Sequence, residues 1–210
     1  MISIRSMDPL QQLKLEYQES TAYHEAAHEV ACIAQRIPVR EFGLRIDSKG
    51  HGASHTYRRS AGDLNNTETD IREREESNVL LFAGYWGQVR VFAEIEDDAI
   101  AKDQSQIDEL LDEMYPHKSV DWQAAKNKLR EESHGLVAEY WPAIEALAKT
   151  LWAKPWKPQE KLPTIDMGWS DDKVEKSIDA KEVEAIVKPF GLNPIILADA
   201  AGTWIRPAEY

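Results

Sequence analysis

The sequence feature that most constrains the fold of this chain is the run 21–35, TAYHEAAHEVACIAQ. It is rich in alanine and carries apolar residues at helical spacing, so it predicts a helix that ends before Pro38. Within this run, His24, Glu25 and His28 form an HExxH motif. Because residues four apart lie one turn above each other on a helix, the two imidazoles can bind a single divalent cation.

The glutamate of the motif indicates what that cation would do. Glu25 lies about 100° round the helix from His24, which places its carboxylate beside a water on the metal rather than among the ligands. Zinc lowers the pKa of such a water toward ~7, and the glutamate can then take its proton. The motif therefore favours zinc-dependent hydrolysis with Glu25 as the general base. The alternative is a chance match, in which both histidines are ordinary core or surface groups.

Composition narrows the remaining classes of protein. The chain has 210 residues, a single cysteine and a net charge of −12. This length predicts one domain spanning residues 1–210, and the acidity disfavours binding to nucleic-acid phosphates. No apolar run is long enough to span a membrane and the first ten residues do not resemble a signal peptide, so we expect a cytoplasmic protein without membrane contact. Cys32, one turn after His28, is expected to be a buried structural thiol rather than a ligand.

A β-hairpin is predicted directly after the motif helix. Residues 39–48 alternate apolar and polar side chains, residues 49–52 have the composition of a turn, and residues 53–59 predict a second strand. The edge of such a hairpin can hold an extended peptide by main-chain hydrogen bonds. His51 and His55 are expected to be solvated, or to support the site, rather than to bind metal. The predicted substrate-binding residues are Gly52, Ala53, Ser54, His55, Thr56 and Tyr57.

Most of the remaining sequence predicts helices, so the expected fold class is α+β, mostly α-helical, with a small sheet or hairpin. A helix from Pro9 either runs straight into the motif helix or breaks near Glu19. Residues 153–176, rich in proline and lysine, are predicted to be an inserted loop, and the tail 191–210 has no pattern that predicts structure. Further helices are predicted to begin at Thr67 and to span 99–114, 120–129, 136–152 and 180–188.

A catalytic zinc needs a third protein ligand. The metzincin pattern is excluded, because Ala31 and Ala34 stand where it requires glycine and histidine. Glu73 or Glu76, on the next predicted helix, is one candidate, although the charge run around them is more simply a solvated face. A second candidate is Asp103, near the start of the predicted helix 99–114, where a carboxylate can face the motif helix and complete a metal site.

Six segments of the chain, taken together and in their order, form a pattern that is specific to one protein family. They are AYHEAAHEV, FGLRIDSKGHGASHTY, LLFAGYWGQVRVF, AIAKDQSQIDELLDEM, LVAEYWPAIEALAKTLW and SIDAKEVEAIV. Over residues 10–190 the chain thereby resembles the peptidase domain of the FtsH-type metallopeptidases, the M41 peptidases. The resemblance implies that Asp103 is the third zinc ligand beside His24 and His28, and that the strand containing residues 52–57 holds the peptide substrate.

The chain departs from the family pattern at several places. Ala27 replaces the glycine of the family's HEAGH motif, and Gln88 stands where the family has a carboxylate near the site. No G-x-x-x-x-G-K-S/T loop is present, so we expect no ATPase in this chain and only short or unfolded peptides as substrates. Because family members form hexamers, a homo-oligomer and a separate ATPase partner both stay open. The alternative function is a zinc-containing regulatory or binding module with little turnover.

Overall fold

A computed structural model describes residues 8–56, 68–92, 98–159 and 174–197. These residues form a mostly helical α+β fold with a small sheet, as the sequence predicts. The helices are α1 (Pro9–Ala34), α2 (Glu68–Val89), α3 (Asp98–Met114), α4 (Val120–Glu139), α5 (Trp141–Ala153) and α6 (Ala180–Val187). The strands are β1 (Val39–Asp47), β2 (Gly52–Thr56), β3 (Lys157–Pro158), β4 (Val174–Ile178) and β5 (Ile196–Leu197).

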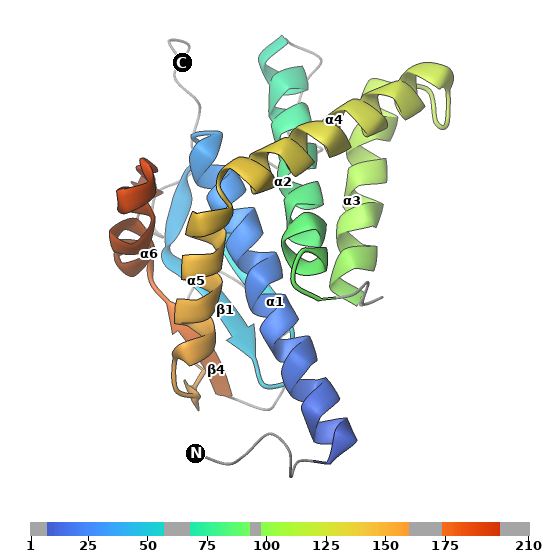
Figure 1. The fold of residues 1–210 in the computed structure, drawn as a ribbon. Helices are drawn as coiled ribbons and strands as arrows, with labels where there is room; N and C mark the ends of the chain where they lie inside the picture. The colour runs from blue at the N-terminus through green and yellow to red at the C-terminus, as the bar shows by residue number, and fades with distance from the viewer. Residues whose placement is uncertain (1–7, 57–67, 93–97, 160–173, 198–210) are drawn as a thin grey trace.

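The motif helix α1 lies in the middle of the molecule (Figure 1). It packs against α2 and α5 and against strands β1 and β2, while α4 crosses α2 part-way along its length. Close packing on several sides is permitted by small side chains, because Ala22, Ala26, Ala27 and Ala31 are all fully buried. The helix is continuous from Pro9, so of the two alternatives for the first segment the unbroken helix is confirmed.

The sheet has the strand order β2-β1-β4-β3, with β5 pairing in parallel with the start of β1. The pairs β1–β2 and β1–β4 are antiparallel, so β1 is central and β2 forms one edge of the described sheet. The predicted hairpin is therefore confirmed through Thr56. Its remaining predicted residues, Tyr57 to Arg59, lie outside the described residues, as does Thr67.

The alternation of residues 39–48 predicts a strand with one buried face, and this prediction is wrong for the second half of β1. Every residue from Gly43 to Asp47 is buried. The polar positions are buried because they are paired. Arg45 donates two hydrogen bonds to the carboxylate of Glu175 on β4, at 3.0 and 3.1 Å. A central strand covered on both faces loses the alternation that marks a half-exposed strand.

Three other predicted boundaries differ from the structure. The two helices expected at 120–129 and 136–152 are α4 and α5, which break at Tyr140 because Pro142 cannot continue a helix but fits its first turn. The loop predicted at 153–176 contains β3 and the first residues of β4. The tail, for which no structure was predicted, supplies β5. Helix α6 begins after Asp179, whose side chain caps it by accepting a hydrogen bond from the Glu182 N–H.

No helix within the described part of the chain is both long enough and apolar enough to cross a membrane.

Candidate metal centre

Three side chains from α1 and α3 point their donor atoms at one another. The Nε2 atoms of His24 and His28 are 2.9 Å apart. Oδ2 of Asp103 lies 3.1 Å from Nε2 of His24 and 3.0 Å from Nε2 of His28. Both histidines are buried, and the side chain of Asp103 is 17% exposed. This group could hold a metal ion. Asp103 lies beside the motif histidines, as predicted from the sequence.

The spacing and chemistry of these atoms fit a small divalent cation. Three acceptor atoms at the corners of a nearly equilateral triangle repel one another unless a proton or a cation lies between them. These three residues would hold such a cation through two imidazole nitrogens and one carboxylate oxygen, the donor types that bind a catalytic zinc.

The second ring nitrogen of His28 is held by the backbone of α2. Its Nδ1 lies 2.8 Å from the carbonyl oxygen of Leu80. Because a carbonyl can only accept, Nδ1 carries a proton, and in the neutral ring Nε2 then has the lone pair that a metal ligand needs. Such a hydrogen bond fixes both the orientation and the tautomer of a ligating histidine.

A glycine of α2 allows this helix to approach both ligand rings. A Cβ atom at Gly84 would lie 2.6 Å from Cε1 and Nε2 of His28 and 2.7 Å from Cε1 of His24. Real Cβ atoms do not make such contacts. The absence of a side chain at this position is therefore part of how the imidazoles are packed. The sequence signal that could have identified Gly84 is a glycine inside an otherwise strong helical pattern.

Electrostatics keep the Asp103 carboxylate ionised. Burial by itself would raise its pKa, but the positive charge of His28 and the hydrogen bonds from both histidines outweigh burial and hold the pKa well below its usual range. A cation among the three donors would act in the same direction. The carboxylate is therefore available as a ligand across the physiological range of pH.

Glu25 lies on a different side of α1, against the start of β2. Glu25 is buried, and its carboxylate accepts a hydrogen bond from the Ser54 N–H. A Cβ atom at Gly52 would lie 2.5 Å from Oε1 of Glu25. Burial raises the pKa of Glu25, and the charges of His24 and His28 oppose that rise. The structure thus places a buried carboxylate one residue from His24 of the candidate metal site, where a general base was predicted.

A second buried glutamate was not predicted from the sequence. Glu29 is fully buried, and its Oε2 accepts a hydrogen bond of 2.6 Å from the hydroxyl of Ser54. Burial raises the pKa of Glu29 to about 8, and the neighbouring Glu25 charge adds to the rise. Ser54 therefore contacts both glutamates, through its backbone N–H and its hydroxyl. A charged residue within the apolar run 26–34 was the available signal.

The predicted substrate-binding strand begins at this point. Gly52, Ala53 and Ser54 belong to β2 and run past Glu25. His55 and Thr56 complete the strand, and Tyr57 lies outside the described residues. Two hydrogen bonds tie the hairpin turn to α1: Thr21 Oγ1 donates to the Gly50 carbonyl at 2.8 Å, and Gln18 Nε2 donates to the Ser48 carbonyl at 2.5 Å. The edge strand is thereby held beside the motif.

The alternative ligands are not part of this group. His51 is 58% exposed at its side chain and pairs with Asp47 at 3.0 Å, which agrees with a solvated role. Cys32 is buried, as predicted for a structural thiol. Glu76 pairs with Arg72 at 2.9 Å and precedes Gly84 by two helical turns, about 12 Å along α2. Among the described residues, the group of possible ligands includes neither Glu73 nor Glu76.

No protein-family model matches this chain, and no curated protein matches it. The site is therefore defined by its own geometry: a buried His–His–Asp group that could hold a metal, with a buried glutamate and an edge strand beside it.

Proposed function

We propose that this chain is a zinc-dependent peptidase of the FtsH type that hydrolyses short or unfolded peptides without an ATPase of its own. The observation that carries the proposal is the meeting of His24, His28 and Asp103 within about 3 Å of one another, next to Glu25. The six segments that resemble the M41 peptidases support the same reading, since they assign the third ligand to Asp103.

His24, His28 and Asp103 would hold the zinc ion, which when bound would polarise the scissile carbonyl and acidify the attacking water. Glu25 takes a proton from that water and passes it to the leaving amine. Burial suits Glu25 to this role, because a raised pKa makes the carboxylate a stronger base. The charge of a zinc ion bound by the three ligands would act in the opposite direction and favour the ionised carboxylate.

The edge strand β2 is the proposed binding surface for the substrate backbone. An extended peptide that pairs with β2 lies alongside Glu25, because residues 52–54 contact that side chain. A segment already paired within a folded protein cannot offer its backbone in this way. The proposed substrates are therefore short peptides and unfolded segments.

The second candidate is a zinc-containing regulatory or binding module with little turnover. One observation favours it: Gln88 is fully buried at the position where the family resemblance places a carboxylate. An amide cannot replace the charge of a carboxylate, so chemistry that depends on that charge would be lost.

The test measures metal content and cleavage together. Wild type, Glu25→Gln and Asp103→Ala are purified, bound zinc is quantified, and each protein is incubated with unfolded casein and a peptide library. We expect one zinc ion per wild-type chain, its loss in Asp103→Ala, and in Glu25→Gln full zinc content with cleavage at least about 100-fold slower.

The wild type and its two variants separate the two candidate functions. Unchanged cleavage by Glu25→Gln would show that the proposed mechanism is wrong. Zinc without cleavage in the wild type would favour the binding module. Absence of zinc would show that the motif does not bind metal.

A further inference from the structure

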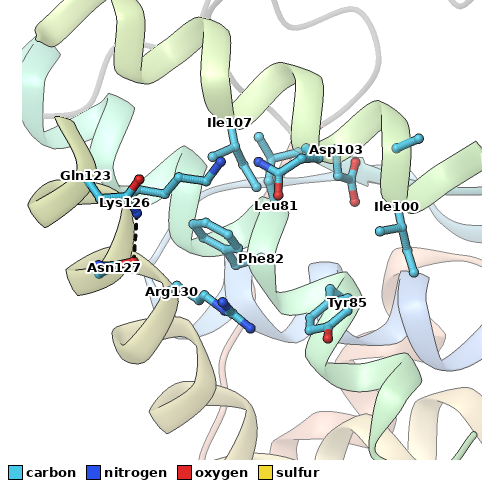
Figure 2. Close-up of a pocket in the computed structure, with 12 residues that line it drawn as sticks. Leu81, Phe82, Tyr85, Ile100, Asp103, Ile107, Gln123, Lys126, Asn127 and Arg130 are labelled. Atoms are coloured by element: carbon cyan, nitrogen blue, oxygen red, sulfur yellow. Dashed lines mark hydrogen bonds between the residues drawn. The ribbon is translucent and has the colours of Figure 1, made fainter. Parts of the chain in front are cut away.

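A cavity of about 710 Å³ opens beside the metal group, between α2, α3 and α4. Asp103 lies in its wall, so the cavity and the candidate metal centre share a residue. Its volume falls in the range of sites that bind small ligands or substrate side chains, about 300–1,000 Å³. Figure 2 shows the side chains that line it.

One part of the wall is apolar. Leu81 and Phe82 contribute from α2, and Ile100 and Ile107 from α3. Hydrocarbon placed against these side chains would leave water, which favours binding of an apolar stem. This part of the cavity adjoins Asp103 (Figure 2).

The α4 side of the cavity is basic. Lys126 and Arg130 are four residues apart on α4, so they share one face of the helix, and both line the cavity. Figure 2 shows them extending from α4 into the hollow on either side of Phe82, with Asp103 across from them on α3. Two cations on one wall are notable in a chain with a net charge of −12.

The two cations differ in what already neutralises them. Lys126 pairs with the Asp108 carboxylate at 2.6 Å. Arg130 is held differently: its guanidinium lies 5.2 Å from the centre of the Trp86 ring, and the Trp86 indole N–H donates to the Arg130 carbonyl at 3.2 Å. Among the described residues, no carboxylate lies within ion-pair distance of Arg130. Its planar donors therefore face the cavity and can bind a carboxylate from outside the chain.

We propose that this cavity binds a substrate carboxylate carried on a short apolar stem, with Arg130 as the residue that recognises the charge. The carboxylate belongs either to a glutamate side chain near the cleaved bond or to the C-terminus of the peptide. The inference rests on the proposed peptidase function and adds the substrate class to it. Repulsion of this substrate by Asp103 is reduced, because Oδ2 of Asp103 is paired with His24 at 3.1 Å and with His28 at 3.0 Å.

The experiment compares peptides of one sequence that differ only in charge. One set carries Glu, Gln or Lys in turn at each position flanking the cleaved bond, and a second set carries a free or an amidated C-terminus. The proteins are wild type, Arg130→Gln and the control Lys128→Gln. The control removes the same charge from the same helix, at a side chain that is 66% exposed and outside the cavity.

We expect kcat/KM of the wild type to favour the carboxylate peptide by about tenfold, the scale of one charge-assisted hydrogen bond at a partly exposed site. Arg130→Gln should abolish this preference while cleaving the neutral peptide within about twofold of wild type, and Lys128→Gln should retain the preference. If replacing Glu by Gln lowers the wild-type kcat/KM, the recognised carboxylate belongs to the side chain. If amidation lowers it, the recognised carboxylate is the C-terminus.

A binding measurement separates this inference from the peptidase proposal. The same peptides, fluorescently labelled, are titrated into zinc-loaded Glu25→Gln protein with and without Arg130→Gln. A carboxylate preference that depends on Arg130, together with a wild type that cleaves none of the peptides, would retain the cavity assignment and reject the peptidase. Equal affinity for charged and neutral peptides, or an equal loss on all peptides in Arg130→Gln, would overturn the inference.

Discussion

The two functional sides of α1 are built from different partners. His24 and His28 face α2 and α3, where Leu80, Gly84 and Asp103 surround them. Glu25 and Glu29, also four residues apart, face the start of β2 and share Ser54. One helix thus presents a histidine side, the candidate metal site, to helices and a carboxylate side to a strand.

Under the proposed function, this difference would separate metal binding from proton transfer within one short motif. On the helical side, the imidazole rings contact the backbone of α2 and the Asp103 side chain on α3, and none of these groups belongs to the hairpin. On the strand side, the carboxylates contact the backbone and hydroxyl of Ser54, next to the strand proposed to bind substrate. A change on the helical side should therefore alter metal affinity, and one on the strand side should alter turnover or pH dependence.

The largest expected effect concerns Glu29. Its folded-state pKa of about 8 lies above the ordinary value of 4.5. The folded state therefore holds the proton more tightly, and the stability contributed by protonated Glu29 is present below about pH 4.5 and lost as pH rises to about 8. Relative to wild type, Glu29→Gln should gain free energy of unfolding over this range, on the order of 3 kcal/mol by pH 8.

Urea unfolding at pH 5, 6, 7 and 8, with a chelator present so that metal binding does not contribute, measures this gain. Glu109→Gln, at an exposed glutamate of α3, is the matched control and should change stability little at any pH. A difference between Glu29→Gln and wild type that stays constant with pH would show that Glu29 is ionised in the fold.

The next effect tests the helical side of α1 through Gly84. Gly84→Ala places a methyl group against both ligand rings and should weaken zinc binding by about 10–100-fold, the scale seen when groups supporting metal ligands are changed. Competition with a zinc chelator measures the affinity. Gly135→Ala on α4 is the control, because a Cβ there meets nothing within 4 Å. Wild-type zinc affinity in Gly84→Ala would show that the rings do not depend on this close approach.

The smallest effect tests the strand side through Gly52. A methyl group at this position contacts the end of the Glu25 side chain, which can move aside more easily than backbone. We expect Gly52→Ala to retain full zinc content and to lower kcat by about tenfold, since a misplaced base transfers protons less efficiently. Zinc analysis and peptide cleavage on the same sample check this. Loss of zinc from Gly52→Ala would show that the two sides of α1 do not act independently.

Local pattern was enough to predict several elements. The motif helix, the hairpin through Thr56 and the helix 98–114 follow from alanine content, alternation and helical spacing, all of which act over a few residues. Local sequence patterns failed to predict elements whose structure depends on tertiary packing. Gly135 lies inside α4, although a break was predicted beside it, and residues 174–178 became an inner strand of the sheet.

For the candidate site, the sequence by itself determined the spacing of His24, Glu25 and His28 on one helix, because helical geometry is local. The resemblance to a family suggested Asp103, but only the tertiary structure decided that its carboxylate meets both imidazoles. The same holds for the glycine beside the rings, the serine shared by two glutamates and the cavity that reaches Arg130. These features join residues from separate helices and strands, and such contacts arise from burial of the whole core rather than from any short stretch of sequence.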